Sequence, residues 1–105
     1  MQILTVLGST GSIGVNALDI VSQHPDRFKI FALSCHTRVA DLAAQCEKFK
    51  PVFAVVSDPS KVDTLKRLLK SSSPNTKVLS GVDGLCLVSK DLSVDTVVAA
   101  IVGAV

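Results

Sequence analysis

Three glycines near the amino terminus, Gly8, Gly11 and Gly14, recur every third residue directly after an apolar run. The positions between them are rich in hydroxyl groups, supplied by Ser9, Thr10 and Ser12. A glycine turn that leads from a strand into a helix gathers free backbone N–H groups and the positive end of the helix dipole at one point. Such a point attracts phosphate, so we predict a phosphate-binding turn, with the hydroxyl groups as additional donors to phosphate oxygens.

The residues on either side of this turn have the pattern that the prediction needs. Residues 3–7 (ILTVL) form the unbroken apolar run of a strand covered on both faces. After the turn, apolar residues recur at helical spacing and predict a core-facing stripe of Ile13, Ala17, Ile20 and Val21. An ordinary glycine turn with a Ser or Thr cap is the alternative, but the strand before and the helix after favour a dinucleotide site.

Each glycine has a separate physical role in this prediction. Gly8 permits the sharp turn off the strand, Gly11 leaves room for a pyrophosphate, and Gly14 allows the helix to pack closely on the sheet. The spacing is GxxGxxG, one residue longer before its second glycine than the common GxGxxG fingerprint.

A second group of polar residues, 34–38 (SCHTR), follows the next predicted strand. Sites that prefer NAD usually place Asp or Glu here to accept the ribose hydroxyls. Arg38 would instead attract the 2′-phosphate of NADPH, with His36 and Thr37 as further donors. The sequence therefore favours NADPH; the alternative is that Thr37 caps a helix and Arg38 is an ordinary surface side chain.

Composition limits the other classes of function. The chain has 105 residues, 48% of them hydrophobic, which suffices for one modest core. Its net charge is +2, its cations are interspersed with acids, and it has four Phe but no Tyr or Trp, so we expect no nucleic-acid partner. No apolar run is long enough to span a membrane, and we expect neither a targeting peptide nor a membrane partner.

The three cysteines, Cys35, Cys46 and Cys86, are far apart and form no CxxC pair. Only His36 stands beside one of them, so a zinc site lacks ligands. We interpret all three as small buried hydrophobic residues of a protein in the reducing cytoplasm.

Strand and helix patterns alternate along the rest of the chain. We predict strands at 29–34, 52–56, 77–80 and 96–102. The first helix between them has the predicted core positions Val39, Leu42, Ala43, Cys46 and Phe49. A second helix is capped by Asp58, begins with Pro59 and has the predicted core positions Val62, Leu65, Leu68 and Leu69. Residues 81–88 are predicted to form a short helix or loop.

This alternation predicts an α/β fold with right-handed crossovers, a Rossmann-like doubly wound parallel sheet that is incomplete at its carboxyl end. Ligand then binds at the carboxyl ends of the strands, where residues 8–14, 34–38, 57–58 and Gly103 are expected to converge.

Several segments carry a family resemblance that covers essentially the whole chain. LTVLGSTGSIG (4–14) and ALDIVSQHPDRFKIFAL (17–33) closely resemble the amino terminus of the 1-deoxy-D-xylulose 5-phosphate reductoisomerases, and the likeness continues through AAQCEKFKPVFAVVSD (43–58), VLSG (78–81) and VVAAIVGA (97–104). One departure lies at 36–38, where many members have glycine, then Lys or Arg, then a small polar residue. This chain has His36-Thr37-Arg38, which keeps the positive charge.

The resemblance implies an NADPH-dependent homodimeric enzyme that converts 1-deoxy-D-xylulose 5-phosphate to 2-C-methyl-D-erythritol 4-phosphate in isoprenoid biosynthesis, with Mg²⁺ or Mn²⁺ holding the substrate oxygens. It implies cofactor contacts at Thr10, Gly11, Ser12, Ile13, His36, Thr37 and Arg38. The family's metal and catalytic residues follow the AAIVGA segment, so we expect residues 1–105 to be an amino-terminal NADPH-binding part without catalytic or metal-binding residues of its own.

Two other interpretations remain open on the sequence. One is a reductase of the aspartate-semialdehyde or homoserine dehydrogenase type, whose glycine turn is similar. The other is a non-enzymatic nucleotide-binding module. We also expect exposed apolar edge surface on the last strand and a tendency of the isolated chain to aggregate.

Overall fold

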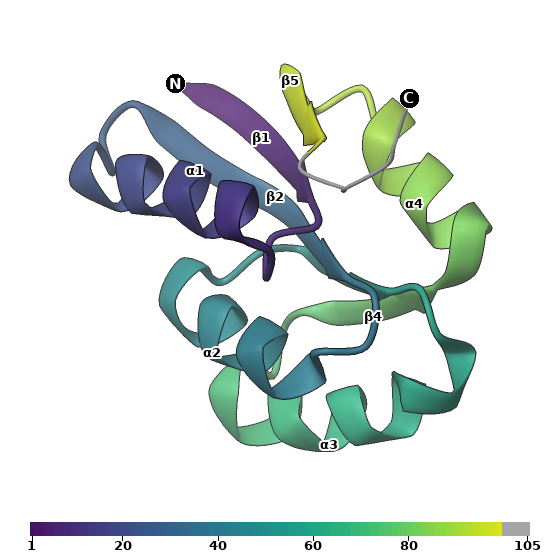
Figure 1. Cartoon of the computed structure of the whole chain (residues 1–105). Coiled ribbons are helices and arrows are strands. Elements are labelled where there is room, and N and C mark those ends of the chain that lie inside the picture. Colours follow the sequence, from purple (N-terminus) through teal and green to yellow (C-terminus); the bar gives the residue numbers. More distant parts are fainter. Residues whose placement is uncertain (100–105) are drawn as a thin grey trace.

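A computed structural model describes residues 1–99, in which strands and helices alternate as predicted (Figure 1). The elements in order are β1 (Gln2–Leu7), α1 (Ser12–Gln23), β2 (Phe28–Cys35), α2 (Val39–Phe49), β3 (Phe53–Val56), a short 3₁₀ helix η1 (Pro59–Lys61), α3 (Val62–Ser72), β4 (Lys77–Ser80), α4 (Gly81–Lys90) and β5 (Thr96–Ala99).

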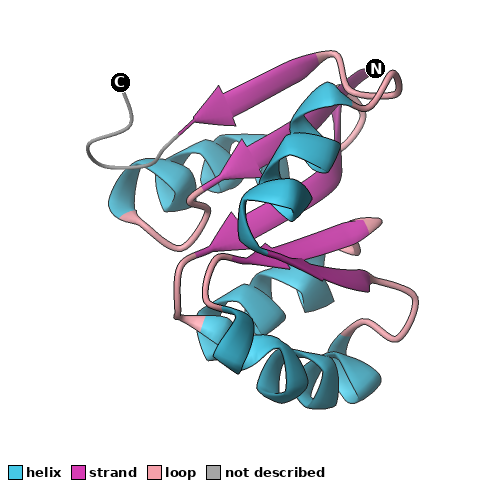
Figure 2. Ribbon diagram, turned by 90° about the vertical axis from the view of Figure 1, so that its right-hand side faces the viewer, coloured by secondary structure: helices cyan, strands magenta, loops and turns pink. Residues whose placement is uncertain are grey.

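The five strands form one parallel sheet in the order β4-β3-β2-β1-β5. The chain first proceeds outward from β1 to β4 and then returns to place β5 on the other side of β1. The direction of winding therefore reverses between β1 and β5, which confirms the doubly wound α/β fold. The carboxyl ends of the strands lie along one edge of the sheet, with the helices packed on its two faces (Figure 2).

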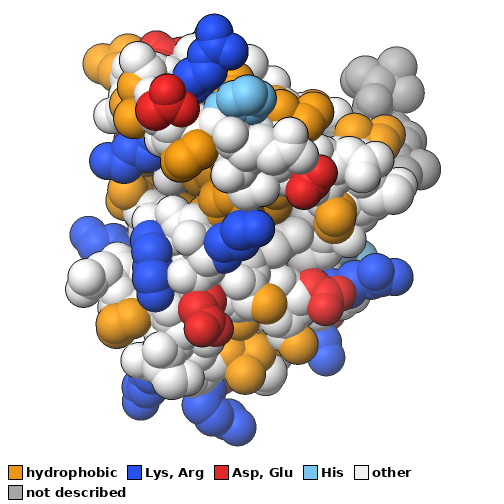
Figure 3. Space-filling view, turned by 90° about the vertical axis from the view of Figure 1, so that its left-hand side faces the viewer, with side chains coloured by type: hydrophobic (Ala, Val, Ile, Leu, Met, Phe, Trp, Pro, Cys, Tyr) orange, Lys and Arg blue, Asp and Glu red, His pale blue; other side chains and the backbone are white. Residues whose placement is uncertain are grey.

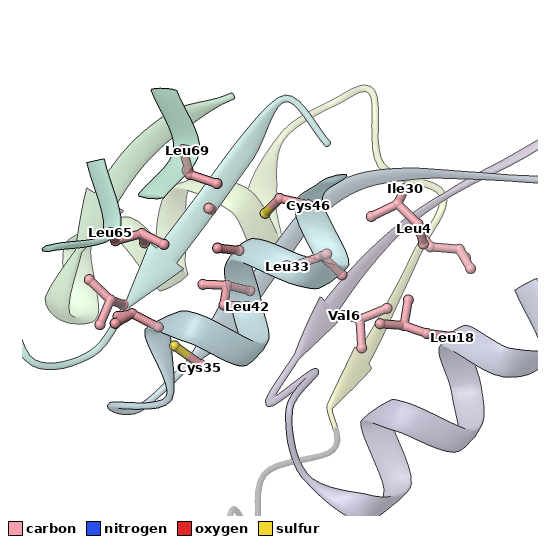
Figure 4. Close-up of a cluster of buried hydrophobic side chains, with 14 of the residues drawn as sticks. Leu4, Val6, Leu18, Ile30, Leu33, Cys35, Leu42, Cys46, Leu65 and Leu69 are labelled. Carbon is pink, nitrogen blue, oxygen red and sulfur yellow. The ribbon is translucent and has the colours of Figure 1, made fainter. Parts of the chain in front are cut away.

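Each face of the sheet has its own apolar core. Side chains of α1, α2 and α3, among them Leu18, Leu42 and Leu65, pack on one face against β1, β2 and β3 (Figure 4). On the other face, Val88 of α4 packs with residues of β2 and β3. The Thr5 hydroxyl on β1 donates to the Val88 carbonyl at 2.8 Å and so fixes α4 to the sheet.

The predicted core-facing stripe of α1 was wrong for its two isoleucines. Ile13 is 60% exposed and Ile20 is 56% exposed, whereas Gly14, Leu18 and Val21 are buried. Gly14 packs against the turn that precedes the helix, and this contact fixes the helix rotation. Residues four and seven positions later share its side, while Ile13 and Ile20 are turned away by about 100°.

Other element boundaries differ from the prediction by small amounts. Strand β2 is one residue longer at each end than predicted, and the 81–88 segment forms the helix α4. Asp58 caps η1, with its carboxylate accepting from the Ser60 N–H, and α3 follows that turn. Strand β5 is confirmed from Thr96 to Ala99; the rest of the predicted strand lies outside the described residues.

The surface agrees with the charge pattern of the sequence. On the side of α1 and α2, Lys and Arg side chains are dispersed among acidic and apolar ones and form no continuous basic stripe (Figure 3). Within residues 1–99, no helix combines the length and the hydropathy needed to cross a bilayer.

The cysteine prediction holds for two of the three residues. Cys35 and Cys46 are buried, and burial is the main cause that raises their thiol pKa values to about 11 and about 12 respectively. The prediction that Cys86 is buried is wrong: it is exposed because it lies on the outer side of α4, two residues from the buried Val88.

We therefore expect one fast-reacting thiol per native chain. A thiolate is the reactive species, so at pH 8 an aromatic disulfide reagent should label Cys86 promptly and leave Cys35 and Cys46 unmodified. All three should react in denaturant, and Cys86→Ser should abolish the fast native phase. Rapid native labelling of three thiols would contradict this packing.

Candidate functional site

The glycine turn after β1 lies against the carboxyl end of β2. Gly8 adopts a φ of +76°, a conformation that favours glycine, and its N–H donates to the Ser34 hydroxyl at 2.9 Å. The next residue, Ser9, donates its N–H to the Ser34 carbonyl at 2.8 Å. These bonds bring together the two segments that the sequence analysis expected to converge.

The first turn of α1 offers backbone donors to a ligand. The Gly11 N–H donates to the Gly8 carbonyl at 3.2 Å, and helical bonding begins with the Val15 N–H, which donates to the Gly11 carbonyl at 2.8 Å. No side chain caps the helix at Gly11, and neither Ser12 nor Ile13 is buried. The N–H groups of this turn and the helix dipole therefore point to a position suited to an anion.

Gly14 keeps the helix start close to the turn. A Cβ at this position would lie 2.6 Å from Ser9 Cα and 2.9 Å from Ser9 C, and it would also collide with the Gly8 carbonyl oxygen. These are backbone atoms of the turn itself, so the turn, rather than the sheet that the sequence suggested, is what a side chain at residue 14 would meet first.

The Ser9 hydroxyl does not serve the role suggested from the sequence. Ser9 is fully buried, and its hydroxyl lies 2.7 Å from Gln45 Oε1 and 3.1 Å from the Ser34 carbonyl. In return, Gln45 Nε2 donates to the Ser9 carbonyl at 2.7 Å. The hydroxyl is therefore committed to the interior, because two neighbouring elements enclose it, and Thr10 and Ser12 carry the hydroxyl groups left for a ligand.

Gln45 was not among the predicted site residues. It lies on α2, three residues after the buried Leu42 and beside the buried Cys46. A polar residue that flanks the apolar stripe of a helix is the only signal for it in the sequence, and that signal does not identify its partner.

The loop after β2 presents His36, Thr37 and Arg38, and all three are exposed. Arg38 occupies the position that caps α2, no side chain caps that helix, and Val39 N–H donates to the Thr37 carbonyl at 2.8 Å. Thr37 is therefore not the cap of α2. Its hydroxyl is exposed, as are the side chains of His36 and Arg38 on either side of it.

The segment after β3 lies alongside this loop, as predicted for residues 57–58. Ser57 N–H donates to the Cys35 carbonyl at 2.9 Å, and Asp58 N–H donates to the His36 carbonyl at 3.2 Å. Hydrogen bonds from the Ser60 hydroxyl and N–H are the main cause that lowers the pKa of the Asp58 carboxyl, with Lys61 and His36 adding to the effect. Gly103, expected at the same edge, lies outside the described residues.

Metal-ligating side chains are dispersed over the described residues. No group of three or more His, Cys, Asp or Glu side chains is close enough to hold a metal ion anywhere in residues 1–99. At this edge of the sheet the described residues present backbone N–H groups, hydroxyls and the Arg38 guanidinium, which are donors suited to phosphate.

Comparison with known proteins gives a consistent result. The family model for 1-deoxy-D-xylulose 5-phosphate reductoisomerase matches residues 4–105. The proteins of that name from Pseudomonas fluorescens strain SBW25 and from Tolumonas auensis are each 50% identical to this chain over 104 residues. The match covers 99% of this chain and 26% of each relative, so the chain spans about a quarter of the length of the curated relatives.

Solved structures match equally well. A crystal structure of DOX-P reductoisomerase in complex with magnesium superposes with a TM-score of 0.93 and 44% identity, covering 99% of this chain and 26% of that chain. A second, in complex with NADPH, fosmidomycin and magnesium, has a TM-score of 0.91 and 42% identity over 96% of this chain and 24% of that chain. The enzyme from Zymomonas mobilis in complex with NADPH has a TM-score of 0.87 and 35% identity over 95% of this chain and 26% of that chain.

Proposed function

The chain belongs to the 1-deoxy-D-xylulose 5-phosphate reductoisomerase family, and from this premise we propose that residues 1–105 form its amino-terminal NADPH-binding part. The observation that carries the proposal is the uncapped start of α1 beside the basic loop after β2. Both lie at the carboxyl edge of the sheet and next to β1, where the winding reverses. This is where doubly wound folds bind dinucleotides.

Two groups of residues divide the binding task. Thr10, Gly11, Ser12 and Ile13 bind the pyrophosphate through the N–H groups of the first helical turn and two hydroxyls. His36, Thr37 and Arg38 bind the 2′-phosphate, and the Arg38 guanidinium provides charge-assisted hydrogen bonds. Gly8 and Gly14 shape the turn and need not touch the cofactor.

We propose that the full gene product converts 1-deoxy-D-xylulose 5-phosphate to 2-C-methyl-D-erythritol 4-phosphate for isoprenoid synthesis. The substrate is rearranged to a branched aldehyde phosphate, which is then reduced by hydride from NADPH. A Mg²⁺ or Mn²⁺ ion would be bound by oxygen ligands outside residues 1–99. We further propose that the gene product acts as a homodimer in the cytoplasm, the assembly and compartment that its family membership favours.

Calorimetric titration with NADPH and NADH in parallel tests the cofactor proposal. We expect NADPH to bind more tightly than NADH, because the Arg38 guanidinium attracts the 2′-phosphate that NADH lacks. The full gene product is the control if the 105-residue chain aggregates. Folded full-length protein that binds neither nucleotide would refute the cofactor site, whereas equal affinities would remove only the role of the 36–38 loop.

A further inference from the structure

We propose that Gln45 is a positioning residue for the cofactor: its side-chain amide orients the peptide group between Ser9 and Thr10 so that the Thr10 N–H faces the bound pyrophosphate. This inference rests on the proposed NADPH site. It gives a residue on α2 a role in holding the backbone of the glycine turn in its binding orientation. Gln45 itself touches no phosphate in this proposal. It acts through the backbone of Ser9.

The first step of the argument is the geometry of one hydrogen bond. Gln45 Nε2 donates to the Ser9 carbonyl oxygen at 2.7 Å, which draws that carbonyl toward α2. The Ser9 carbonyl and the Thr10 N–H belong to the same peptide unit. In a planar trans peptide these two groups point in opposite directions. The described chain has no cis peptide, so the Thr10 N–H is directed away from α2.

The second step is that an amide is required at residue 45. Gln45 Oε1 accepts from the Ser9 hydroxyl at 2.7 Å while Nε2 donates to the Ser9 carbonyl, so both hydrogen bonds end on one residue of the turn. A carboxylate could accept from the hydroxyl but could not donate to the carbonyl. The Ser9 carbonyl would then face a like partial charge in a partly buried place, and the peptide would be free to rotate.

The third step is that α2 is connected to both proposed parts of the NADPH site, the glycine turn and the 36–38 loop. Helix α2 begins at Val39, directly after the basic residues 36–38, and Gln45 lies in its second turn. The hydrogen bonds of Gln45 therefore attach the glycine turn to α2, the helix that follows the 36–38 loop. Because the pyrophosphate is common to both nucleotides, loss of Gln45 should weaken NADPH and NADH alike, unlike a change at Arg38.

The test compares Gln45→Glu with Ser9→Ala in calorimetric titrations of the full gene product with NADPH and NADH. Gln45→Glu removes the donor to the Ser9 carbonyl, whereas Ser9→Ala removes the hydroxyl and keeps the carbonyl. We expect Gln45→Glu to raise both dissociation constants by about tenfold, the effect of one to two hydrogen bonds, with an unchanged NADPH to NADH ratio. Ser9→Ala should remain within about threefold of wild type, because the bond from Gln45 to the carbonyl still orients the peptide.

Two measurements and two further variants separate positioning from a general loss of structure. Thermal melting establishes that each variant is folded, and Lys48→Gln on the exposed side of α2 controls for the same loss of one positive unit of net charge on that helix. Gln45→Met serves if the glutamate variant unfolds, since residue 45 lies in the groove lined by Val15, Leu18 and Phe49, where an apolar side chain can pack. In the NMR spectrum, the Thr10 amide resonance should move on NADPH addition in wild type and much less in the Gln45 variants.

The outcomes are distinguishable. Wild-type protein that binds neither nucleotide overturns the proposed function and this inference with it. Wild-type binding with unchanged affinity in folded Gln45→Glu or Gln45→Met overturns the role of Gln45 alone. A loss confined to NADPH would also overturn it, because that result would place Gln45 at the 2′-phosphate.

Discussion

Replacing Gly14 with alanine is expected to reduce NADPH binding by more than tenfold and to destabilise the fold. The added Cβ would lie 2.6 Å from Ser9 Cα and would meet the Gly8 carbonyl oxygen, so backbone must move. Overpacking of this kind costs about 1–3 kcal/mol, and alanine recovers about 1 kcal/mol of helix propensity, so the net loss of stability is at most about 2 kcal/mol. The moving backbone is the turn that we propose to bind phosphate, which is why we expect binding to suffer more than stability.

A matched glycine makes this prediction specific. Gly81 has a φ of +69° and open space where a Cβ would stand, so Gly81→Ala strains only its own backbone, at a cost of about 1 kcal/mol. The two variants should therefore show similar losses in urea unfolding but differ in NADPH titration, where Gly81→Ala keeps wild-type affinity. Normal NADPH affinity in Gly14→Ala would show that the turn does not contact the cofactor.

The sequence was sufficient to predict those parts of the site that depend on residues adjacent in the chain. The glycine turn was predictable because strand, turn and helix signals follow one another within residues 3–23. The parallel sheet and the edge where its ligand segments meet follow from alternating elements, since right-handed crossovers leave few other topologies. These predictions needed no knowledge of which side chain meets which.

Features set by partners distant in sequence were not predictable in the same way. The sequence suggests Ser9 as a phosphate ligand because its hydroxyl belongs to a glycine turn between a strand and a helix. The hydroxyl instead bonds to Gln45, which is 36 residues away in sequence, on α2. Likewise, the rotation of α1 is set by the contact of Gly14 with the turn, so Ile13 and Ile20 are exposed although periodicity alone placed them inward. Hydrophobic spacing identifies residues that can lie on one side of a helix, but tertiary contacts set the rotation of the helix and so decide which residues face the core.

The exposed position of Ile13 is compatible with its predicted place beside the cofactor. If the second residue of α1 were fully buried, other parts of the protein would cover it and a ligand could not reach it. Ile13 is exposed, so one side of the helix start is accessible. The departure from the predicted core thus frees the surface at which the pyrophosphate is proposed to bind.

Changing Arg38 to glutamate is expected to reverse the preference for NADPH over NADH. Arg38 stands exposed at the start of α2. The substitution replaces an attractive charge with a repulsive one at the proposed 2′-phosphate position. Each such interaction at a solvated site is worth about 1 kcal/mol or somewhat more at contact distance, so NADPH should bind about 30- to 100-fold more weakly. NADH should be little affected, because its ribose hydroxyls can donate to the new carboxylate.

Parallel titrations of both nucleotides at two salt concentrations measure this effect and its origin. Arg27→Glu makes the same change of net charge at the opposite end of β2, about 26 Å from the site at the rise of a parallel strand, and should leave the preference intact. The preference for NADPH in wild type should weaken as salt rises, since charge screening acts on the solvated 2′-phosphate contact. If Arg38→Glu retains the wild-type ratio of affinities, the 2′-phosphate lies elsewhere, and the glycine turn alone remains as the basis for cofactor binding.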